Sequence, residues 1–246
     1  MQITRTIQSL GPIDAASVRR DPLLRYMIIM PVFLALLVRF AVGAIGDTLM
    51  QRMGFDLAPY YPAIMSYFIV LMIPFLFGVV IGFLLLDEKD ADTLTALQVT
   101  PLPLGSYVAY RVVIPTILSV VMTLIAFPIT GLSGLSLPQM VIVALSSALL
   151  APAFALFLGA FAQNKVQGFA LLKGLGAILL VPVAGFFVNM PLQLLFGLLP
   201  TYWPLKAYWQ LDAGQPDFWI YLLIGLVYQV ALLALFLRRF SQVMHR

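Results

Sequence analysis

Residues 112–164 read VVIPTILSVVMTLIAFPITGLSGLSLPQMVIVALSSALLAPAFALFLGAFAQN and contain no Asp, Glu, Lys, Arg or His. In ordinary soluble domains about a quarter of the residues are charged, and these residues lie on the surface. A helix needs about 20 apolar residues to span the hydrocarbon core of a bilayer. This stretch is too long for one crossing and fits two, so it predicts a membrane protein.

The rest of the 246-residue chain has the same character. It is 62% hydrophobic and 10% charged, with a mean hydropathy of +1.02. It contains no cysteine and one histidine, His245, so we expect no disulfide and no metal site. The net charge of +4 is not gathered into a basic face, so no nucleic-acid partner is expected.

Six apolar runs have the length of a membrane crossing. Helices are expected rather than strands, because isolated strands cannot satisfy their backbone polar groups in lipid and the runs show no alternation of apolar and polar residues. The sequence therefore predicts an all-α, polytopic membrane protein with six transmembrane helices. The expected spans are Tyr26–Ile45, Ile64–Leu86, Val112–Leu132, Met140–Phe161, Phe169–Val188 and Phe218–Leu237.

The distribution of cations predicts the orientation of these spans. With six spans both termini lie on one side, and eleven cations fall on that side, against Arg52 and Lys206 in the opposite loops. Cytoplasmic loops carry an excess of Lys and Arg, so both termini are expected in the cytoplasm and the protein in the cytoplasmic (inner) membrane. The eleven cations are Arg5, Arg19, Arg20, Arg25, Lys89, Arg111, Lys165, Lys173, Arg238, Arg239 and Arg246.

The N-terminal residues 1–25 mix apolar and basic side chains. This pattern predicts an amphipathic helix on the cytoplasmic membrane surface. It is expected to start near Asp14 or Ser17 and to break before Pro22, since a proline disfavours helical geometry in the residue before it. An unstructured basic tail is the alternative.

Residues 26–246 are expected to form one transmembrane domain, with an external loop at 189–217. The run from Leu199 to Trp209 in this loop is rich in Trp and Tyr, which favour the headgroup level of a membrane. It predicts short helices that lie at the outer interface or dip into it. A simple aromatic belt is the alternative interpretation.

The loop after the second span, residues 87–110, is the most distinctive charged segment. Asp90 is a plausible N-cap, Leu94 and Leu97 share one helical face, and Pro101 stops the run. The segment predicts a short amphipathic helix between two spans, which a cytoplasmic partner can grip. An ordinary loop helix lying on the membrane is the alternative.

This loop resembles the cytoplasmic loop of type-2 ATP-binding-cassette (ABC) exporter permeases, in which a coupling helix docks on the ATPase subunit. The segment Arg19-Arg20-Asp21-Pro22 looks like the N-terminal lead-in of that family, and Leu199-Pro200 through Ala207 looks like its outer re-entrant helices. One departure is Ala91-Asp92, where family members often have a glycine. The resemblance implies that the ATPase-binding residues here are Glu88, Thr93, Leu94, Leu97, Thr100, Pro101 and Leu102.

The resemblance also implies the rest of the transporter. The chain has no Gly-x-x-x-x-Gly-Lys-Ser/Thr phosphate loop, so a separate ATPase subunit is expected to bind ATP and Mg, and this chain is expected to be neither an enzyme nor the holder of a cofactor. A second permease chain, identical or related, is expected beside it. The implied function is export of a hydrophobic or amphipathic cargo, such as a drug, lipid, peptide or polymer precursor. A secondary transporter, a lipid-modifying membrane enzyme and a structural or sensory subunit are the alternatives.

Four residues within the spans are candidates for the substrate pathway. Arg39 is the one charge well inside an expected span, where a charge faces protein or water; outward snorkelling or a structural pair with Asp47 is the alternative. Tyr67, Phe75 and Phe83 are spaced eight apart and fall roughly on one helical face. Packing against lipid explains these three aromatic residues equally well.

Overall fold

The computed structural model describes residues 2–91 and 104–244 of the chain. In this part of the chain every regular element is a helix. Six helical segments are long and apolar enough to cross a membrane: Pro22–Met53, Ala58–Asp90, Gly105–Thr130, Leu137–Phe161, Lys165–Phe187 and Phe218–Gln242. The predicted all-α, six-span fold is therefore confirmed.

Several spans contain more than one helical element. The first is α2 (Pro22–Leu37), η1 (Val38–Val42) and α3 (Gly43–Met53), and the second is η2 (Ala58–Tyr60), α4 (Tyr61–Met65), η3 (Ser66–Leu71) and α5 (Met72–Asp90). The third is α7 (Leu104–Thr130), the fourth α8 (Leu137–Ala148) with α9 (Leu150–Phe161), the fifth α10 (Lys165–Ala184) with η4 (Gly185–Phe187), and the sixth α12 (Phe218–Met244). Outside the spans lie α1 (Gln2–Arg20), η5 (Leu192–Leu198) and α11 (Tyr202–Asp212).

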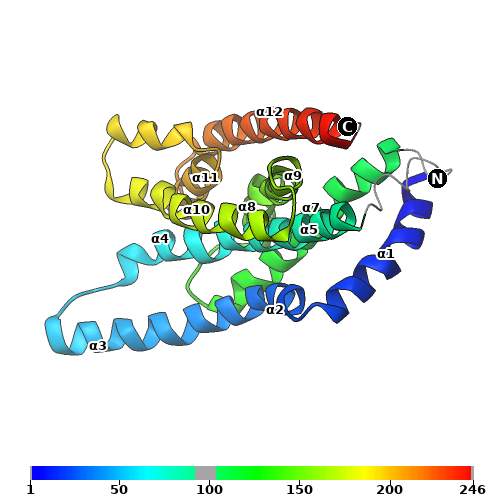
Figure 1. Ribbon diagram of the computed structural model, residues 1–246. Coiled ribbons are helices and arrows are strands. Elements are labelled where there is room, and N and C mark those ends of the chain that lie inside the picture. The colour runs from blue at the N-terminus through cyan, green and yellow to red at the C-terminus, as the bar shows by residue number, and fades with distance from the viewer. Residues whose placement is uncertain (1, 92–103, 245–246) are drawn as a thin grey trace.

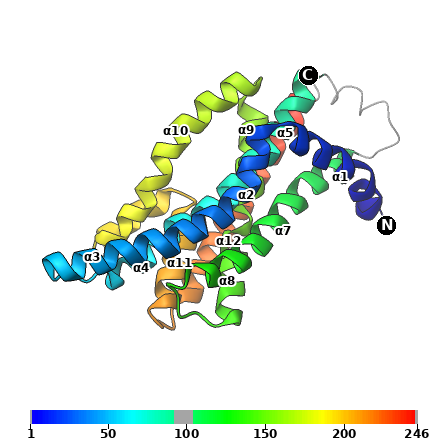
Figure 2. The same cartoon turned by 90° about the horizontal axis from the view of Figure 1, so that it is seen from below.

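The spans run roughly side by side, and both termini lie at one end of the bundle (Figures 1 and 2). We call this the terminal end; it also carries α1 and the ends of α5 and α7 that flank residues 92–103. We call the other end, with the far end of α3 and the connection from α11 to α12, the distal end. The common position of the termini agrees with an even number of crossings.

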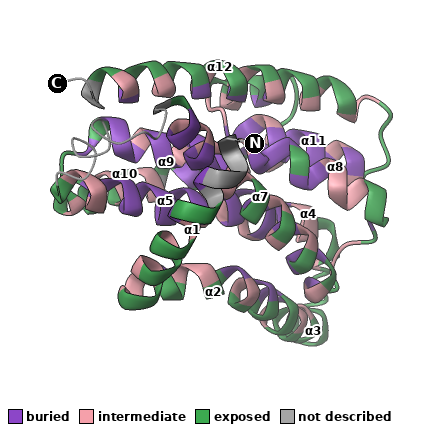
Figure 3. Ribbon diagram, turned by 90° about the vertical axis from the view of Figure 1, so that its right-hand side faces the viewer, coloured by how far each residue is buried: buried purple, intermediate pink, exposed green. Residues whose placement is uncertain are grey.

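Two spans form the centre of the bundle and four surround it. The most apolar windows of the second and fourth spans are 83% and 67% buried, whereas those of the other four are 17–28% buried. Figure 3 shows this division as buried residues on α5, α8 and α9 and exposed residues on α12, α3 and α1. The outer spans present apolar surface, as expected for helices that face lipid or another membrane protein.

The two central spans touch through glycines. A Cβ added at Gly78 of α5 would lie 2.5 Å from the carbonyl oxygen of Ala151 and 2.6 Å from Cβ of Phe154, both in α9. One turn later, a Cβ at Gly82 would lie 2.6 Å from Cδ1 of Leu158. The Gly78-x-x-x-Gly82 pair thus lets the two helix backbones approach closely, as small residues do in membrane helix pairs.

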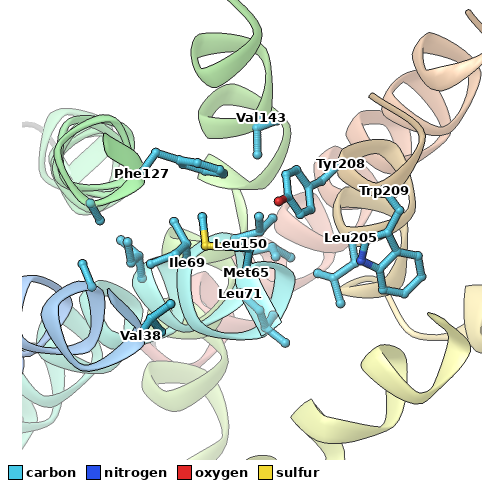
Figure 4. Packing of buried hydrophobic residues seen from close by; sticks show 14 of the residues in the cluster. Val38, Met65, Ile69, Leu71, Phe127, Val143, Leu150, Leu205, Tyr208 and Trp209 are labelled. Carbon is cyan, nitrogen blue, oxygen red and sulfur yellow. The ribbon is translucent and has the colours of Figure 1, made fainter. Parts of the chain in front are cut away.

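The largest apolar cluster lies where the distal halves of several spans meet (Figure 4). Figure 4 shows Met65, Ile69 and Leu71 of the second span between Phe127 of α7 on one side and α11 on the other. The tyrosine and tryptophan of α11 in this view, Tyr208 and Trp209, are 1% and 6% exposed. Helix α11 is therefore a short helix packed into the bundle, which favours the predicted short helices over a simple aromatic belt. We keep the predicted name, re-entrant segment, for η5 and α11.

Three spans are irregular near their middle. Elements η1 and η3 are π-helical turns, and the fourth span is interrupted at Leu149. Pro152 explains the interruption, because it has no N–H and its ring clashes with the carbonyl of Ala148, four residues earlier. The fully buried Gln229 of α12 donates from Nε2 to the carbonyl of Ser146, 2.8 Å away, beside this break.

The N-terminal segment is helical from Gln2 to Arg20, so the predicted start near Asp14 or Ser17 is wrong. Gly11 and Pro12 lie within the helix and do not end it. The helix ends where the sequence predicts, because Asp21 is extended and caps α2 by accepting from the backbone N–H of Leu23 at 2.9 Å. Proline is well suited to the first helical position that follows.

The first span is longer than its apolar run. It extends to Met53, past the expected end at Ile45, because the polar residues that follow are compatible with a helix. The chain turns only at Gly54, which has a φ of +63° and supplies the left-handed residue that ends many helices.

We expect Gly78→Ala to lower the free energy of unfolding by about 1–3 kcal/mol, because the added methyl group meets the backbone of α9. The matched control is Gly174→Ala in α10, where an added Cβ has no atom within 4 Å; it should be neutral or stabilise by up to about 1 kcal/mol. Thermal unfolding of the two variants in nanodiscs measures the difference. Equal stability of both variants would contradict the close contact.

Candidate functional site at the terminal end

The first turns of α7 carry a fully buried cation, Arg111. Its guanidinium Nη1 donates to Oδ2 of Asp14 in α1 at 2.7 Å, and its Nη2 donates to Oε1 of Glu88 near the end of α5. Nη2 also lies 3.3 Å from Oδ1 of Asp14. One guanidinium therefore joins the N-terminal helix to the second and third spans.

Two tyrosines of α7 complete this group. Tyr110 donates its hydroxyl proton to Oδ2 of Asp14 at 2.8 Å, and Tyr107 donates to Oε2 of Glu88. The guanidinium carbon of Arg111 lies 5.3 Å from the centre of each tyrosine ring, within cation–π distance. We call these five residues, Asp14, Glu88, Tyr107, Tyr110 and Arg111, the Arg111 cluster.

A second ion-pair group lies at the same end. Lys165, the first residue of α10, places Nζ 2.7 Å from Oδ1 of Asp87 and 3.1 Å from Oδ2 of Asp21. Burial raises the pKa of the Asp21 carboxyl, but hydrogen bonds from Lys165 and from the backbone N–H groups of Leu24 and Leu23, with the charge of Lys165, lower it more. The net pKa of Asp21 is below its ordinary value.

The ammonium group of Lys89 binds backbone carbonyl oxygens. Its Nζ donates to the carbonyl oxygens of Gly159 and, at 3.1 Å, Ala162 at the end of α9. Carbonyls at a helix C-terminus lack intrahelical donors, and a cation there also suits the helix dipole.

Together these contacts fix both sides of the loop that the sequence singles out. The end of α5, which leads into residues 92–103, is held by Arg111, Lys165 and α9, while the start of α7, which leaves them, supplies Arg111 itself. Helix α1 is attached to both sides through Asp14. Side-chain contacts therefore join α1, α5 and α7 next to the loop.

Only one of the seven predicted ATPase-binding residues lies in the described part of the chain. Glu88 is there, and its carboxylate is occupied by Arg111 and Tyr107 within the chain. The other six, with the predicted short helix, lie within 92–103, outside the described residues: Thr93, Leu94, Leu97, Thr100, Pro101 and Leu102. Asp90, predicted as the N-cap of that helix, is the last residue of α5, because that helix continues past its apolar run.

Arg39, a predicted pathway residue, lies in η1 and is exposed. Its Nη1 donates to the carbonyl oxygen of Ile129 at 3.1 Å, near the end of α7. The expected alternative partner, Asp47, makes no ion pair within the described residues. The contact with Ile129 links the first and third spans where α7 ends.

The three predicted pathway aromatics pack against different rings. Tyr67 lies in the π-helical turn η3, which shifts the helical register ahead of Phe75 and Phe83. Phe75 packs edge-on against Phe154 of α9, with ring centres 5.2 Å apart, whereas Phe83 is 1% exposed and lies against Phe169 of α10 at 4.7 Å. Phe83 is therefore a core residue in this structure, and Phe75 packs between helices.

The distal end holds another buried cation. Lys206 of α11 is 7% exposed, donates to Oε1 of Gln193 at 2.7 Å and lies 5.3 Å from the ring centre of Tyr221. Burial lowers the pKa of Lys206, and the charge of Asp217 opposes this effect. The sequence places Lys206 in an external loop, but here it stabilises the re-entrant segment.

The sequence did not single out four members of the Arg111 cluster as site residues. The sequence suggests Asp14 only as a possible start of the N-terminal helix, and Arg111 only as one of eleven cytoplasmic cations. A signal was present, because Tyr107, Tyr110 and Arg111 share one helical face by their spacing directly before a stretch without charges. A cation at that boundary requires partners, although the sequence does not say which.

Comparison with known proteins identifies relatives over nearly the whole chain. The sequence model of one family, described as "Fluoroquinolones export permease protein Rv2686c-like", matches residues 14–237. Two proteins of Mycobacterium tuberculosis, named fluoroquinolones export permease protein MT2760 (strain CDC 1551 / Oshkosh) and Rv2686c (strain ATCC 25618 / H37Rv), are each 34% identical over 238 residues. The alignments cover 96% of this chain and 94% of each relative. No solved structure matches.

We expect Arg111→Met to lower the free energy of unfolding by about 3–5 kcal/mol, because it leaves two carboxylates at a largely buried site without their cation. The matched control is Arg238→Met. Arg238 is exposed on α12 and has no ion pair within the described residues, so its loss should change stability by less than about 1 kcal/mol. Denaturant or thermal unfolding in nanodiscs measures both variants.

The triple variant Asp14→Asn/Glu88→Gln/Arg111→Met tests the cause of that loss. Removing all three charges also removes the unpaired carboxylates, so we expect the triple variant to be more stable than Arg111→Met alone. A triple variant as unstable as the single one would show that packing, and not charge, explains the effect.

The lowered pKa of Asp21 predicts a pH-dependent contribution. The ionised carboxylate stabilises the folded state above the unfolded-state pKa, and this stability is lost as the pH falls through the lower pKa of the folded state. We expect Asp21→Asn, which keeps an N-cap, to be less stable than the wild type at pH 7 by up to about 1 kcal/mol. The difference should vanish in acid; a gap that persists there would assign it to the cap.

Proposed function

Because the chain belongs to the Rv2686c-like family of fluoroquinolones export permease proteins, we propose that it is the membrane subunit of an ATP-driven exporter of fluoroquinolones. In this proposal a separate ABC ATPase binds ATP and Mg, and residues 92–103 dock on it. Two permease chains enclose the pathway. The cargo class is taken from the names of the relatives and agrees with the amphipathic cargo that the sequence suggests.

The observation that carries the proposal is the attachment of both sides of the loop to one buried guanidinium. Arg111 holds Glu88 at the end of α5 and Asp14 in α1 while itself belonging to α7. An ATPase that pulls residues 92–103 would therefore move three helices together. A freely hinged loop would absorb the same movement.

The orientation in this proposal places the terminal end in the cytoplasm. The eleven cations assigned to that side support it, because cytoplasmic loops are rich in Lys and Arg. The loop would then face the compartment that contains ATP.

A second permease chain is proposed because the outer spans bury little of their surface within one chain. The most apolar windows of the first and fifth spans are 22% and 18% buried. Lipid covers part of such a surface, and a second copy or a related chain is proposed to cover the rest and to complete the pathway.

The test is reconstitution with an ABC ATPase, which we would first look for in the reading frames beside this gene. We expect ATP-dependent uptake of a fluoroquinolone into inside-out vesicles that contain both proteins, and co-purification of the ATPase on a tag attached to the permease. Equal uptake by vesicles that contain the permease without any ATPase would overturn the proposal.

The variant Leu97→Asp should lose both co-purification and uptake, because it places a charge on the proposed apolar docking face. Its control is Leu137→Asp, at the first residue of α8 on the distal end, where the leucine is 68% exposed. We expect Leu137→Asp to retain the ATPase, since an acidic residue suits a helix N-terminus. Loss of binding in both variants, or in neither, would contradict the assigned docking segment.

A further inference from the structure

An apolar cavity lies behind the outer helices, away from the Arg111 cluster. It has a volume of about 160 Å³, is partly open to the outside, and lies between α9, α10, α12 and the residues just before α11. Its wall includes Phe154 and Phe157 of α9, Leu175 of α10 and Phe236 of α12. Every lining side chain but Thr201 is a hydrocarbon, and the cavity presents no polar surface.

The shape of this cavity is fixed by its own walls. Phe157 packs against Phe236 with ring centres 5.6 Å apart, and Phe154 packs edge-on against Phe75 from the other side of α9 at 5.2 Å. The rings are therefore held by neighbours and do not need to collapse into the space. Binding sites for small molecules are usually pre-formed in this way.

Its size and chemistry select a class of ligand. An engineered apolar cavity of about 150 Å³ in another protein stays dry and binds benzene. A cavity of this volume cannot admit a whole acyl chain, and it offers no partner for a polar group. Phenylalanine rings also favour an aromatic guest, because edge-to-face ring pairs contribute about 0.5–1.5 kcal/mol beyond area burial.

The position of the cavity brings an occupant into contact with four parts of the chain. Leu150, the first residue of α9 after the break in the fourth span, lines it, as does Pro200 at the entrance to the re-entrant segment. An occupant thus contacts the fourth, fifth and sixth spans and the start of α11 at once.

We propose that this cavity is a binding site for a single aromatic ring, either a monocyclic arene or one ring of a larger molecule, that arrives through the bilayer. The site lies within one chain, so it does not require a second permease. It goes beyond the proposed export function and does not depend on it, because its test measures binding to the permease alone.

The experiment is photolabelling of the full-length chain in nanodiscs with phenyldiazirine, followed by peptide mass spectrometry. We expect saturable labelling of the cavity residues Phe154, Phe157 and Leu232, and loss of this labelling when benzene is in excess. Labelling that rises linearly with the probe and follows only the lipid-facing residues would overturn the proposal. Equal competition by hexadecane would also overturn it, because it would identify a site for lipid chains.

Cavity-filling variants make the test specific. Ala153→Phe adds a ring from α9, and Leu175→Trp enlarges the wall from α10; each should abolish the saturable labelling. Two variants are used because either addition alone could prevent folding. The control Val230→Phe adds a ring to a residue of α12 that is 54% exposed, and it should leave the labelling unchanged. Saturable labelling that survives in a folded cavity-filling variant would place the site elsewhere.

Discussion

The close contact between α5 and α9 determines how the other helices are arranged. In a bilayer the hydrophobic effect does not drive helices together, because lipid chains are as apolar as leucine, and association depends on close packing. Gly78 and Gly82 provide that packing on one side of α5. On another side, Gly168 of α10 brings its backbone to Leu86, since a Cβ there would lie 2.7 Å from Cδ1 of that leucine. Helix α5 thus has closely packed neighbours on two sides, α9 and α10.

A second constraint is that the bilayer offers no water to carbonyl groups left open at helix ends and breaks. In this chain, polar side chains donate hydrogen bonds to such carbonyl groups. Arg39 donates a hydrogen bond to the carbonyl oxygen of Ile129 at the end of α7. Gln229 donates one to the carbonyl oxygen of Ser146 beside the break in the fourth span. The same type of contact recurs as Lys89 with Ala162, Gln193 with Gly185, Trp203 with Gly197 and Tyr228 with Leu198. Each of these side chains thus has a structural partner in the backbone.

The fold could be predicted from the sequence because length and hydropathy alone identify membrane crossings. The break at Asp21–Pro22 was also predictable, since proline acts through local geometry. The partners of the Arg111 cluster were not, because Asp14 and Glu88 are brought to Arg111 only by the packing of three helices. The different positions of the three pathway aromatics have a related cause. Their spacing places Tyr67, Phe75 and Phe83 on one face only of a regular α-helix, and the π-helical turn η3 interrupts that regular helix.

These constraints divide the molecule into a regular part and an irregular part. From the terminal end, α2, α5, α9 and α10 run as uninterrupted helices, while the π-helical turns, the break at Leu149 and the re-entrant segment lie towards the middle and the distal end. Helical irregularities are local weak points in the backbone hydrogen-bond ladder. A movement applied to the Arg111 cluster would pass along stiff helices and be absorbed where the ladder is already interrupted. The apolar cavity, bordered by Leu150 and Pro200, lies at this transition, so an occupant there would contact both the interrupted fourth span and the residues that lead into α11.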